Sequence, residues 1–560
     1  LMRVEVTSEF RRIESLPRRN WEDFAAEAVE LLTKELRTSY GSMRLRDVQA
    51  VALVEAYNQR GLFAPLGVGT GKTLISLLAP TVMRAERPLL IVPAQLRDLT
   101  INKHIPELSE HWKLHPGLEV VSYNKISNDP DFLKNKNPDL IIADECHLLR
   151  HRTAARTKRF IRHMSANPDC RFVGMSGTVT RKSLKDYAHL AEISLREGSP
   201  LPRAHSDLQR WAGVVDMQSE NPFASPQVQP GALLNFVQDT DWPDEMDVPN
   251  RYDRMIVATR NAVRERIMST PGVVATTKSS LACSLNITLN DWQKPAAMTA
   301  HLRTLADSGV TPSGELVTEP LDAWRKGREL SCGFYYEWEW RLEDEPNRIE
   351  WLIRRKEWRQ FVAERIRYSH TYDTEMQVAQ ACVKGKIDSQ GTYEGWVSIR
   401  DLCEPTTVPR WYTNSFVNEV ATNASNIGDC IVWVEQVAFA EMLAEQSGLP
   451  YFGAGCGDAI CDHVNGRLGP CIASIASNST GKNLQAYSKN IVAVPPTSGV
   501  AWEQMLGRTH RPGQDADSVE VDVYQHTGPF RDAFGKAQAN ALFLKQSTGQ
   551  EQKLCYAAII

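Results

Sequence analysis

The chain has 560 residues, of which 42% are hydrophobic and 24% are charged, and its formal net charge is -4. This chain is longer than one that folds around a single hydrophobic core, so about two to four domains are expected. A slightly acidic total excludes attraction to nucleic acid over the whole surface, so such binding has to come from local basic patches. The 11 cysteines follow no pattern, which is typical of a reducing compartment. Residues 1–20 lack the apolar core of a signal peptide, and no apolar run is long enough to span a bilayer, so we expect a cytoplasmic protein.

The front of the chain predicts a short helical extension followed by a parallel-sheet domain. Residues 1–40 are mostly amphipathic, with a helical pattern in WEDFAAEAVELLTKEL. Over 41–190, strand-like and helix-like stretches alternate, which predicts βαβ units. The expected strands lie at 88–94, 118–124, 139–145 and 171–177.

The first chemical motif is GVGTGKT, which precedes the helix-like run TLISLLA. Glycines let backbone N–H groups surround phosphate oxygens, and the start of the next helix adds its dipole. Lys72 would reach the outer phosphates, and the Thr73 hydroxyl would ligate magnesium. The alternative is an ordinary glycine-rich turn. The loop residues expected to bind nucleotide are Gly67, Gly69, Thr70, Gly71, Lys72 and Thr73.

The second motif is the acidic pair in PDLIIADECHLLR. The apolar run before it predicts a buried parallel strand that delivers Asp144 and Glu145 at the carboxyl end of a sheet. Asp144 would hold magnesium through water, and Glu145 would orient and deprotonate an attacking water. The alternative is an acidic pair that only begins a loop.

Residues 191–425 carry no recognisable chemical motif and form the expected insertion between two lobes. Residues 219–250 are rich in Pro, Asn and Asp and predict an irregular segment. The stretch RRKEWRQFVAERIRY predicts a helix whose basic faces, with Arg354 and Arg355, could hold a nucleic-acid backbone. The alternative is a charged outer surface balanced by nearby acids. This insertion could also contact partner proteins.

A second lobe is expected over 426–560. Residues 430–446 predict a strand that passes into a helix, and 471–477 and 490–496 predict further strands. Near the end, EQMLGRTHRPGQ places Arg508 and Arg511 three apart, so their guanidinium groups share a face just before a Pro-Gly stop. A salt-bridged surface would explain this pair on its own. The alternative is that both guanidinium groups face an anion held by another part of the chain.

In this order and spacing, the motifs resemble those of superfamily-two helicases, the RecA-like two-lobe motors driven by ATP. LRDVQ resembles the adenine-reading element, GVGTGKT the phosphate loop, DECH the acidic box and SGT the coupling motif. STGKNLQ resembles the fifth motif and QMLGRTHRPGQ the sixth. The ending GRTHRPGQ is most similar to the SWI/SNF-type DNA-dependent ATPases, although that group usually has Ala or Gly in place of Cys146. Leu66 also stands where the strict phosphate-loop pattern has Gly.

The resemblance implies a role for each motif residue. Arg511 would act as an arginine finger, and Arg508 would contact the γ-phosphate. The remaining implied residues are Arg46, Gln49 and Gln504 for nucleotide; His147, Ser176, Thr178, Gly481 and Asn483 for coupling; and Pro93, Gln95, Ser122, Tyr123, Ser479 and Thr480 for the nucleic-acid backbone.

The expected fold class is therefore α/β, with two RecA-like parallel-sheet lobes and a large, mainly helical insertion between them. The expected function is that of a monomeric motor that uses ATP and Mg²⁺ to move along duplex DNA. Three alternatives stay open: a strand-separating DNA or RNA helicase, a motor-derived scaffold without turnover, and the motor of a restriction or repair complex.

Overall fold

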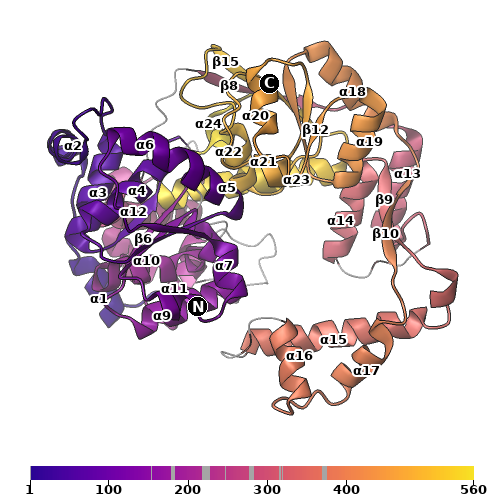
Figure 1. Cartoon of the computed structure of the whole chain (residues 1–560), viewed down its shortest axis with the longest axis horizontal. Coiled ribbons are helices and arrows are strands. Elements are labelled where there is room, and N and C mark those ends of the chain that lie inside the picture. The colour runs from indigo at the N-terminus through magenta and orange to yellow at the C-terminus, as the bar shows by residue number, and fades with distance from the viewer. Residues whose placement is uncertain are drawn as a thin grey trace.

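The protein is described from a computed structural model. It describes residues 2–67, 69–152, 154–177, 183–216, 228–245, 248–275, 283–314, 317, 320–368, 372 and 375–560. Figure 1 shows two α/β lobes side by side and a helical arm that descends from the second lobe and turns back below the first. Two parallel sheets and a largely helical insertion confirm the expected fold class. No helix of the described residues is both long and apolar enough to cross a membrane.

The first lobe is built on a five-stranded parallel sheet in the order β2-β6-β5-β3-β4. Its strands are β2 (Leu62–Pro65), β3 (Pro88–Val92), β4 (Glu119–Ser122), β5 (Leu140–Asp144) and β6 (Arg171–Ser176). All four stretches predicted as strands in this lobe are strands. The helices in this stretch of chain are α3 (Asp47–Gln59), α4 (Lys72–Val82), α5 (Ala94–Leu99), α6 (Ile105–His111), α7 (Tyr123–Asn128), α8 (Phe132–Lys136), α9 (Ala155–Ala166) and α10 (Ala188–Leu195).

The chain beyond 190 also belongs to the first lobe. Helices α11 (His205–Val215) and α12 (Arg251–Met268) contribute Trp211, Val263 and Ile267 to the same apolar core as β3 and β5. Val273 forms a parallel bridge with Phe63 at the outer side of β2. The expected insertion at 191–425 therefore includes a part that completes the first lobe.

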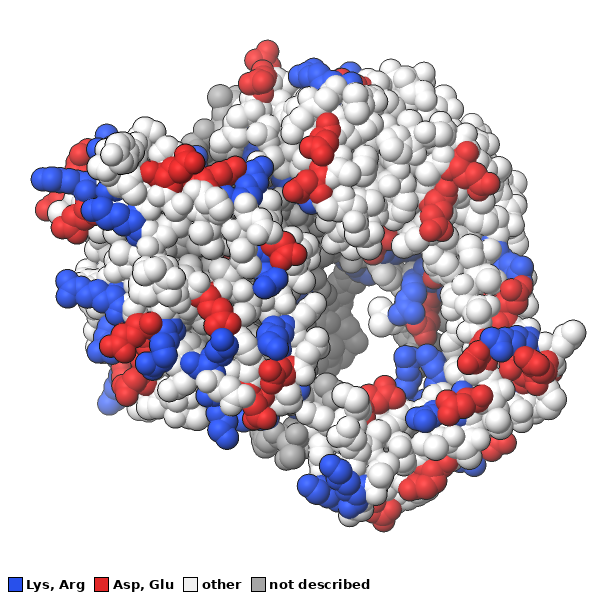
Figure 2. All heavy atoms as spheres, viewed as in Figure 1, with Lys and Arg blue, Asp and Glu red and all other residues white. Residues whose placement is uncertain are grey.

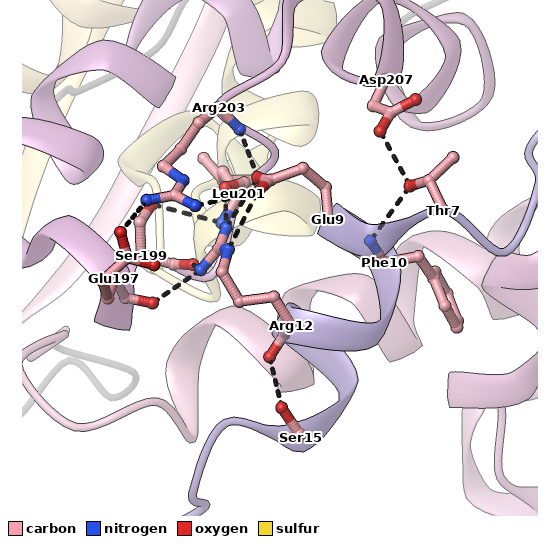
Figure 3. A network of polar contacts seen from close by, with 10 residues as sticks. All are labelled: Thr7, Glu9, Phe10, Arg12, Ser15, Glu197, Ser199, Leu201, Arg203 and Asp207. Atoms are coloured by element: carbon pink, nitrogen blue, oxygen red, sulfur yellow. Dashed lines mark hydrogen bonds and ion pairs between the residues drawn. The ribbon is translucent and has the colours of Figure 1, made fainter.

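Hydrogen bonds and ion pairs of charged side chains join the N-terminal segment to this part of the lobe. Helix α1 (Ser8–Ser15) precedes α2 (Glu22–Leu36), and Arg12 on α1 donates to the carbonyls of Glu197, Ser199 and Leu201 (Figure 3). Glu9 accepts from Arg12 and Arg203, both at 3.1 Å or less. Because α1 is held in this way, residues 2–16 pack as part of the first lobe.

The second lobe has a seven-stranded parallel sheet in the order β12-β13-β11-β14-β15-β8-β16. Its strands are β8 (Ser284–Asn290), β11 (Cys430–Val434), β12 (Tyr451–Phe452), β13 (Cys471–Ser474), β14 (Lys489–Val492), β15 (Ser518–Tyr524) and β16 (Ala558–Ile559). β8 pairs with β15 along its whole length, so the second lobe takes a strand from well before the expected start at 426. The helices of this lobe are α19 (Val437–Ser447), α20 (Ala459–Asn465), α21 (Ile475–Asn478), α22 (Gly499–Leu506), α23 (Gly528–Thr548) and α24 (Lys553–Tyr556).

The arm is inserted between β8 and β11 of the second lobe. At its base, α13 (Ala296–Ser308) and α18 (Ser415–Ile427) contribute to the core of the second lobe. The arm itself consists of α14 (Pro320–Ser331), β9 (Phe334–Glu339), α15 (Arg348–Tyr368), α16 (Glu375–Val383), α17 (Thr392–Arg400) and β10 (Thr406–Trp411). The antiparallel pair β9-β10 forms its stem, and a cluster with Trp338, Trp351 and Trp396 joins the stem to α15 and α17. At the far end of α15, the Lys158 ammonium of the first lobe donates to the carbonyls of Ile366 at 2.9 Å and Tyr372 at 3.2 Å. The arm therefore reaches from the second lobe back to the first.

Candidate active site between the lobes

The glycine-rich loop follows β2 and leads directly into α4, which begins at Lys72. Gly69 and Gly71 have φ angles of 84° and 81°, which favour glycine. A Cβ on Gly71 would lie 2.2 Å from the Gln49 amide nitrogen, so any other residue would displace that side chain. Thr73 is half-buried in the first turn of α4.

Side chains from the start of α3 hold this loop. Gln49 is 5% exposed, and its Nε2 donates to the Thr70 carbonyl at 3.1 Å. The Arg46 guanidinium donates to the Gly69 carbonyl at 2.8 Å, and Thr70 Oγ1 donates to the Gly67 carbonyl at 2.9 Å. The two residues expected to read adenine therefore lie against the phosphate loop and brace it.

Glu145 stands at the carboxyl end of β5, inside a ring of polar side chains. One carboxylate oxygen lies 3.4 Å from the Lys72 ammonium. The other lies 3.2 Å from His147 Nδ1 and accepts from Ser176 Oγ at 3.0 Å. Its φ of 57° and ψ of 49° are left-handed, which is unusual for a residue with a Cβ and costs conformational energy. The sheet edge therefore holds this carboxylate in a defined direction between the lysine and β6.

The two carboxyl groups differ in their electrostatic surroundings. Burial and the charge of Glu145 raise the pKa of Asp144 to about 6, against the opposing charge of Lys72. Burial also acts to raise the pKa of Glu145, but Lys72 and the hydrogen bonds from His147 and Ser176 outweigh it and place that pKa well below its usual range. Glu145 is therefore ionised at neutral pH, as a general base has to be.

The two arginines of the sixth motif converge on one backbone carbonyl. Arg508 Nη1 donates to the Lys482 carbonyl at 3.2 Å, and Arg511 Nη1 donates to the same oxygen at 3.4 Å. Arg508 Nε is satisfied by the Gln504 carbonyl at 2.9 Å, and Arg511 also donates to the Asn483 side chain. Arg511 Nε, however, is buried and has no hydrogen-bond partner among the described residues. A buried donor of this kind needs an acceptor, such as an ordered water or a bound anion.

The second lobe contacts the glycine-rich loop of the first lobe. A Cβ on Gly69 would lie 3.2 Å from Pro512 Cδ, so the residue after Arg511 lies against the glycine loop. Burial and the neighbouring Arg511 lower the pKa of Arg508 to about 10, and the charge of Glu145 across the cleft opposes this. Arg508 stays charged at neutral pH. Arg508 and the residue after Arg511 therefore lie where the second lobe meets the glycine-rich loop and Glu145, and we refer to this place as the interlobe cleft.

Two further contacts join the lobes beside this cleft. Gln95 Nε2 on α5 donates to Thr480 Oγ1 at 2.8 Å. A Cβ on Gly481 would lie 2.0 Å from Leu96 Cδ2, and its φ of 73° also favours glycine. Ser479 is 6% exposed beside them. Residues expected to contact nucleic acid from the two lobes thus lie next to each other.

Several predicted residues have other surroundings than expected. Tyr123 is 2% exposed, and its hydroxyl donates to the Asp144 carbonyl at 2.8 Å, so it supports the acidic pair from within the core. Pro93 is buried at the start of α5, whereas Ser122 is half-buried. Thr178 lies outside the described residues.

The two arginines named on α15 are already engaged. Arg354 donates to Glu357 at 3.2 Å and lies 3.7 Å from Glu350. The Arg355 guanidinium lies over the rings of Trp338 and Trp351, at 5.1 and 5.3 Å from their centroids. Lys356 and Arg359 on the same helix are exposed. These two side chains are the better placed for phosphate.

Two groups at the site have no counterpart in the motif analysis. The Lys482 carbonyl accepts hydrogen bonds from both arginines. Every residue has a backbone carbonyl, so the sequence does not reveal which one takes this role. Lys553, 5% exposed, contacts His510 between the arginines from α24, far along the chain. No pattern around Lys553 distinguishes it from a surface lysine.

No family model matches the chain, and no curated protein matches it. Among solved structures, it is similar to the helicase Lhr of Mycobacterium smegmatis bound to ssDNA and AMP-PNP, at 11% sequence identity and a TM-score of 0.38. The match covers 90% of this chain and 48% of that one, so the chain spans about half the length of the matched protein. A likeness at this level says nothing about activity.

Proposed function

We propose that the protein is an ATP-driven nucleic-acid motor of the superfamily-two type, and specifically a translocase on duplex DNA. One observation carries this proposal. Glu145, ionised and held by Lys72, Ser176 and His147, lies in a cleft that the second lobe closes with Arg508 and Arg511. A base, a phosphate-binding lysine and two arginines in one interlobe cleft are the groups that phosphoryl transfer requires.

ATP would bind with its phosphates in the glycine loop. The loop offers N–H groups and the start of α4, and the Lys72 ammonium would exchange its contact with Glu145 for phosphate oxygens. Arg46 and Gln49 donate hydrogen bonds to backbone carbonyls of the loop, near the place expected for the adenine ring of ATP. Lys72→Ala removes the main cation of the loop, and we expect it to abolish nucleotide binding.

Hydrolysis would begin when Glu145 accepts a proton from the attacking water. Ser176 and His147 hold one of its oxygens and so orient the carboxylate toward the cleft. As charge develops on the transferred phosphoryl group, the Arg511 Nε–H, which finds no acceptor in the part of the chain that the structure describes, would donate to it, and Arg508 would add a second guanidinium.

The donors beside Lys72 fit magnesium, which binds oxygen ligands. Asp144 supplies a carboxylate, and only its Oδ1 is engaged by a hydrogen bond within the described residues, from the Glu145 N–H at 3.0 Å. Thr73 would supply a hydroxyl. Bound there, the ion would neutralise charge on the β- and γ-phosphates.

The nucleic-acid path would cross both lobes where Gln95 meets Thr480. Because these residues come from different lobes, opening and closing around ATP would change their separation and move a bound backbone. Figure 2 shows an opening bounded by the lobes and the arm, with Lys and Arg side chains, and some Asp and Glu, on the side where Figure 1 places α14. The contact of Lys158 with the end of α15 closes the arm over this opening.

Phosphate release by the full chain tests this proposal, measured with single-stranded DNA, duplex DNA or RNA and with Lys72→Ala as the inactive control. Duplex DNA is expected to stimulate most. No stimulation by any nucleic acid would favour a non-hydrolysing scaffold. Triplex displacement without fork unwinding is expected; unwinding without triplex displacement would favour a strand-separating helicase.

A further inference from the structure

The loop between the two arginines is held from behind by His510. This residue is 1% exposed, and its Nε2 lies 2.9 Å from the Cys283 carbonyl. Since a carbonyl only accepts, Nε2 carries the proton. His510 therefore ties the sixth motif to the chain just before β8.

The other nitrogen of the ring faces an ammonium. Lys553 Nζ lies 3.0 Å from His510 Nδ1. An ammonium only donates, so Nδ1 accepts and the ring is neutral. Burial and the charge of Lys553 lower the pKa of His510 to about 4, in agreement with this tautomer.

Lys553 uses all of its donors inside the lobe. Besides the ring, its Nζ donates to the His510 carbonyl at 3.0 Å and to the Tyr556 hydroxyl at 3.3 Å. Its backbone N–H donates to the Glu503 carboxylate at 2.7 Å, which fastens α24 to α22. The same ammonium therefore binds both the ring and the backbone of the residue between Arg508 and Arg511.

A buried ammonium is costly unless it is well paired. The buried carboxylate of Glu503 supplies an opposite charge and explains a cation at this place, but it does not explain why two hydrogen bonds of the ammonium go to His510. The Nζ contact with the His510 carbonyl restrains the backbone just before Arg511, whose guanidinium has to meet the phosphate.

We propose that Lys553 is a positioning residue for ATP hydrolysis, which acts through His510 to hold Arg511 at the cleft. This inference rests on the proposed function. Arg511 itself would touch the transferred phosphoryl group, whereas Lys553 would touch neither substrate nor water. Its effect should therefore fall on turnover and not on ATP binding.

Lys553→Met in the full chain tests the proposal, with kcat and KM for ATP measured from nucleic-acid-stimulated phosphate release. A misplacement near 1 Å can reduce a rate about 100-fold, so we expect kcat to fall by about 10- to 100-fold. KM should change by less than about 3-fold, because the loss is confined to the transition state. Lys553→Arg, which keeps the charge and the donors, should restore most of the rate.

The matched control is Lys545→Met on α23, whose ammonium pairs with Glu551 at 3.0 Å and is 37% exposed. It should turn over ATP like the unaltered protein. Where Lys553→Met does not fold, Lys553→Gln takes its place, since one neutral amide cannot satisfy the three acceptors. An unaltered kcat in the variant used would overturn the proposal.

A double variant separates positioning from general loosening of the lobe. Once Arg511→Ala has removed the group being positioned, adding Lys553→Met should lower kcat by less than about 2-fold, whereas independent effects would multiply. Multiplying losses would overturn the proposal. If the unaltered protein hydrolyses no ATP with any nucleic acid, the proposed function fails, and this inference fails with it. Normal turnover by Lys553→Met removes this inference alone.

Discussion

The interlobe cleft and the arm use charged residues in opposite ways. Between the lobes, Lys72 and Arg508 are buried and Glu145 is largely buried, and Lys72 pairs with Glu145 from another strand end of the sheet. On the arm, Arg354 and Arg410 pair with acids on the same helix or the neighbouring strand. Buried charges are stabilised only by defined geometry, whereas exposed pairs contribute little to stability. The charges between the lobes therefore depend on defined geometry, as the proposed hydrolysis requires, whereas those on the arm form an exposed surface.

Arg511→Ala should have the largest effect on turnover. Removing an arginine finger is worth about 10³-fold or more in rate. Nucleotide affinity should hold, because Lys72 and the loop remain. Single-turnover hydrolysis and the binding of a fluorescent ATP analogue measure the two quantities. Arg531→Ala, an arginine 52% exposed on α23, is the matched control. Lower affinity with an unchanged rate would contradict the assignment.

Glu145→Gln should have the next largest effect on turnover. The amide is nearly isosteric but cannot accept the proton from water, and loss of general-base catalysis is worth about 10²- to 10⁴-fold. ATP should stay bound and unhydrolysed. Quench-flow measurement of the chemical step separates this from slow product release. Glu119→Gln, whose carboxylate pairs with Lys136 at 2.8 Å on the surface, serves as the control. Turnover at the normal rate would rule Glu145 out as the base.

Substitutions on the arm should change the affinity for DNA and not the rate of ATP hydrolysis. Lys356→Ala together with Arg359→Ala removes two exposed cations, and the slope of log affinity against log salt should fall by about 2. Arg354→Ala should change the slope less, since its guanidinium already pairs with Glu350 and Glu357. Titrating labelled duplex DNA at several salt concentrations gives both slopes. An unchanged slope in the double variant would make α15 plain surface.

The contrast between the interlobe cleft and the arm also explains which features the sequence could predict. The chemistry of the cleft restricts residue types, so Gly71, Lys72 and Glu145 stand in recognisable motifs at strand ends. β8 was missed although Leu285 and Ile287 alternate with polar residues as in a half-buried strand, because no motif falls on it and its partner β15 lies far along the chain. Tyr123 shows the opposite limit: a tyrosine beside a serine at a strand end does not reveal whether it faces solvent or the core. The arm follows no motif, and its return to Lys158 depends on tertiary packing alone.

Neither the cleft nor the arm contains Glu9, so Glu9→Gln should change stability and leave kcat unaltered. Burial raises the pKa of this carboxyl, but Arg12 and Arg203 outweigh it and lower the pKa from 4.5 to about 2 (Figure 3). A lowered folded-state pKa stabilises the fold above pH 4.5, by on the order of 3 kcal/mol, and this is lost as the pH falls toward 2.

Denaturant unfolding of Glu9→Gln and the unaltered protein, compared between pH 7 and pH 3, measures this contribution. The difference in free energy of unfolding should be full at pH 7 and should shrink steadily below pH 4.5. Glu197→Gln changes a carboxylate that is 80% exposed in the same network, so its effect should be much smaller. A difference that stays constant with pH would mean that Glu9 supports the lobe by packing and not by its charge.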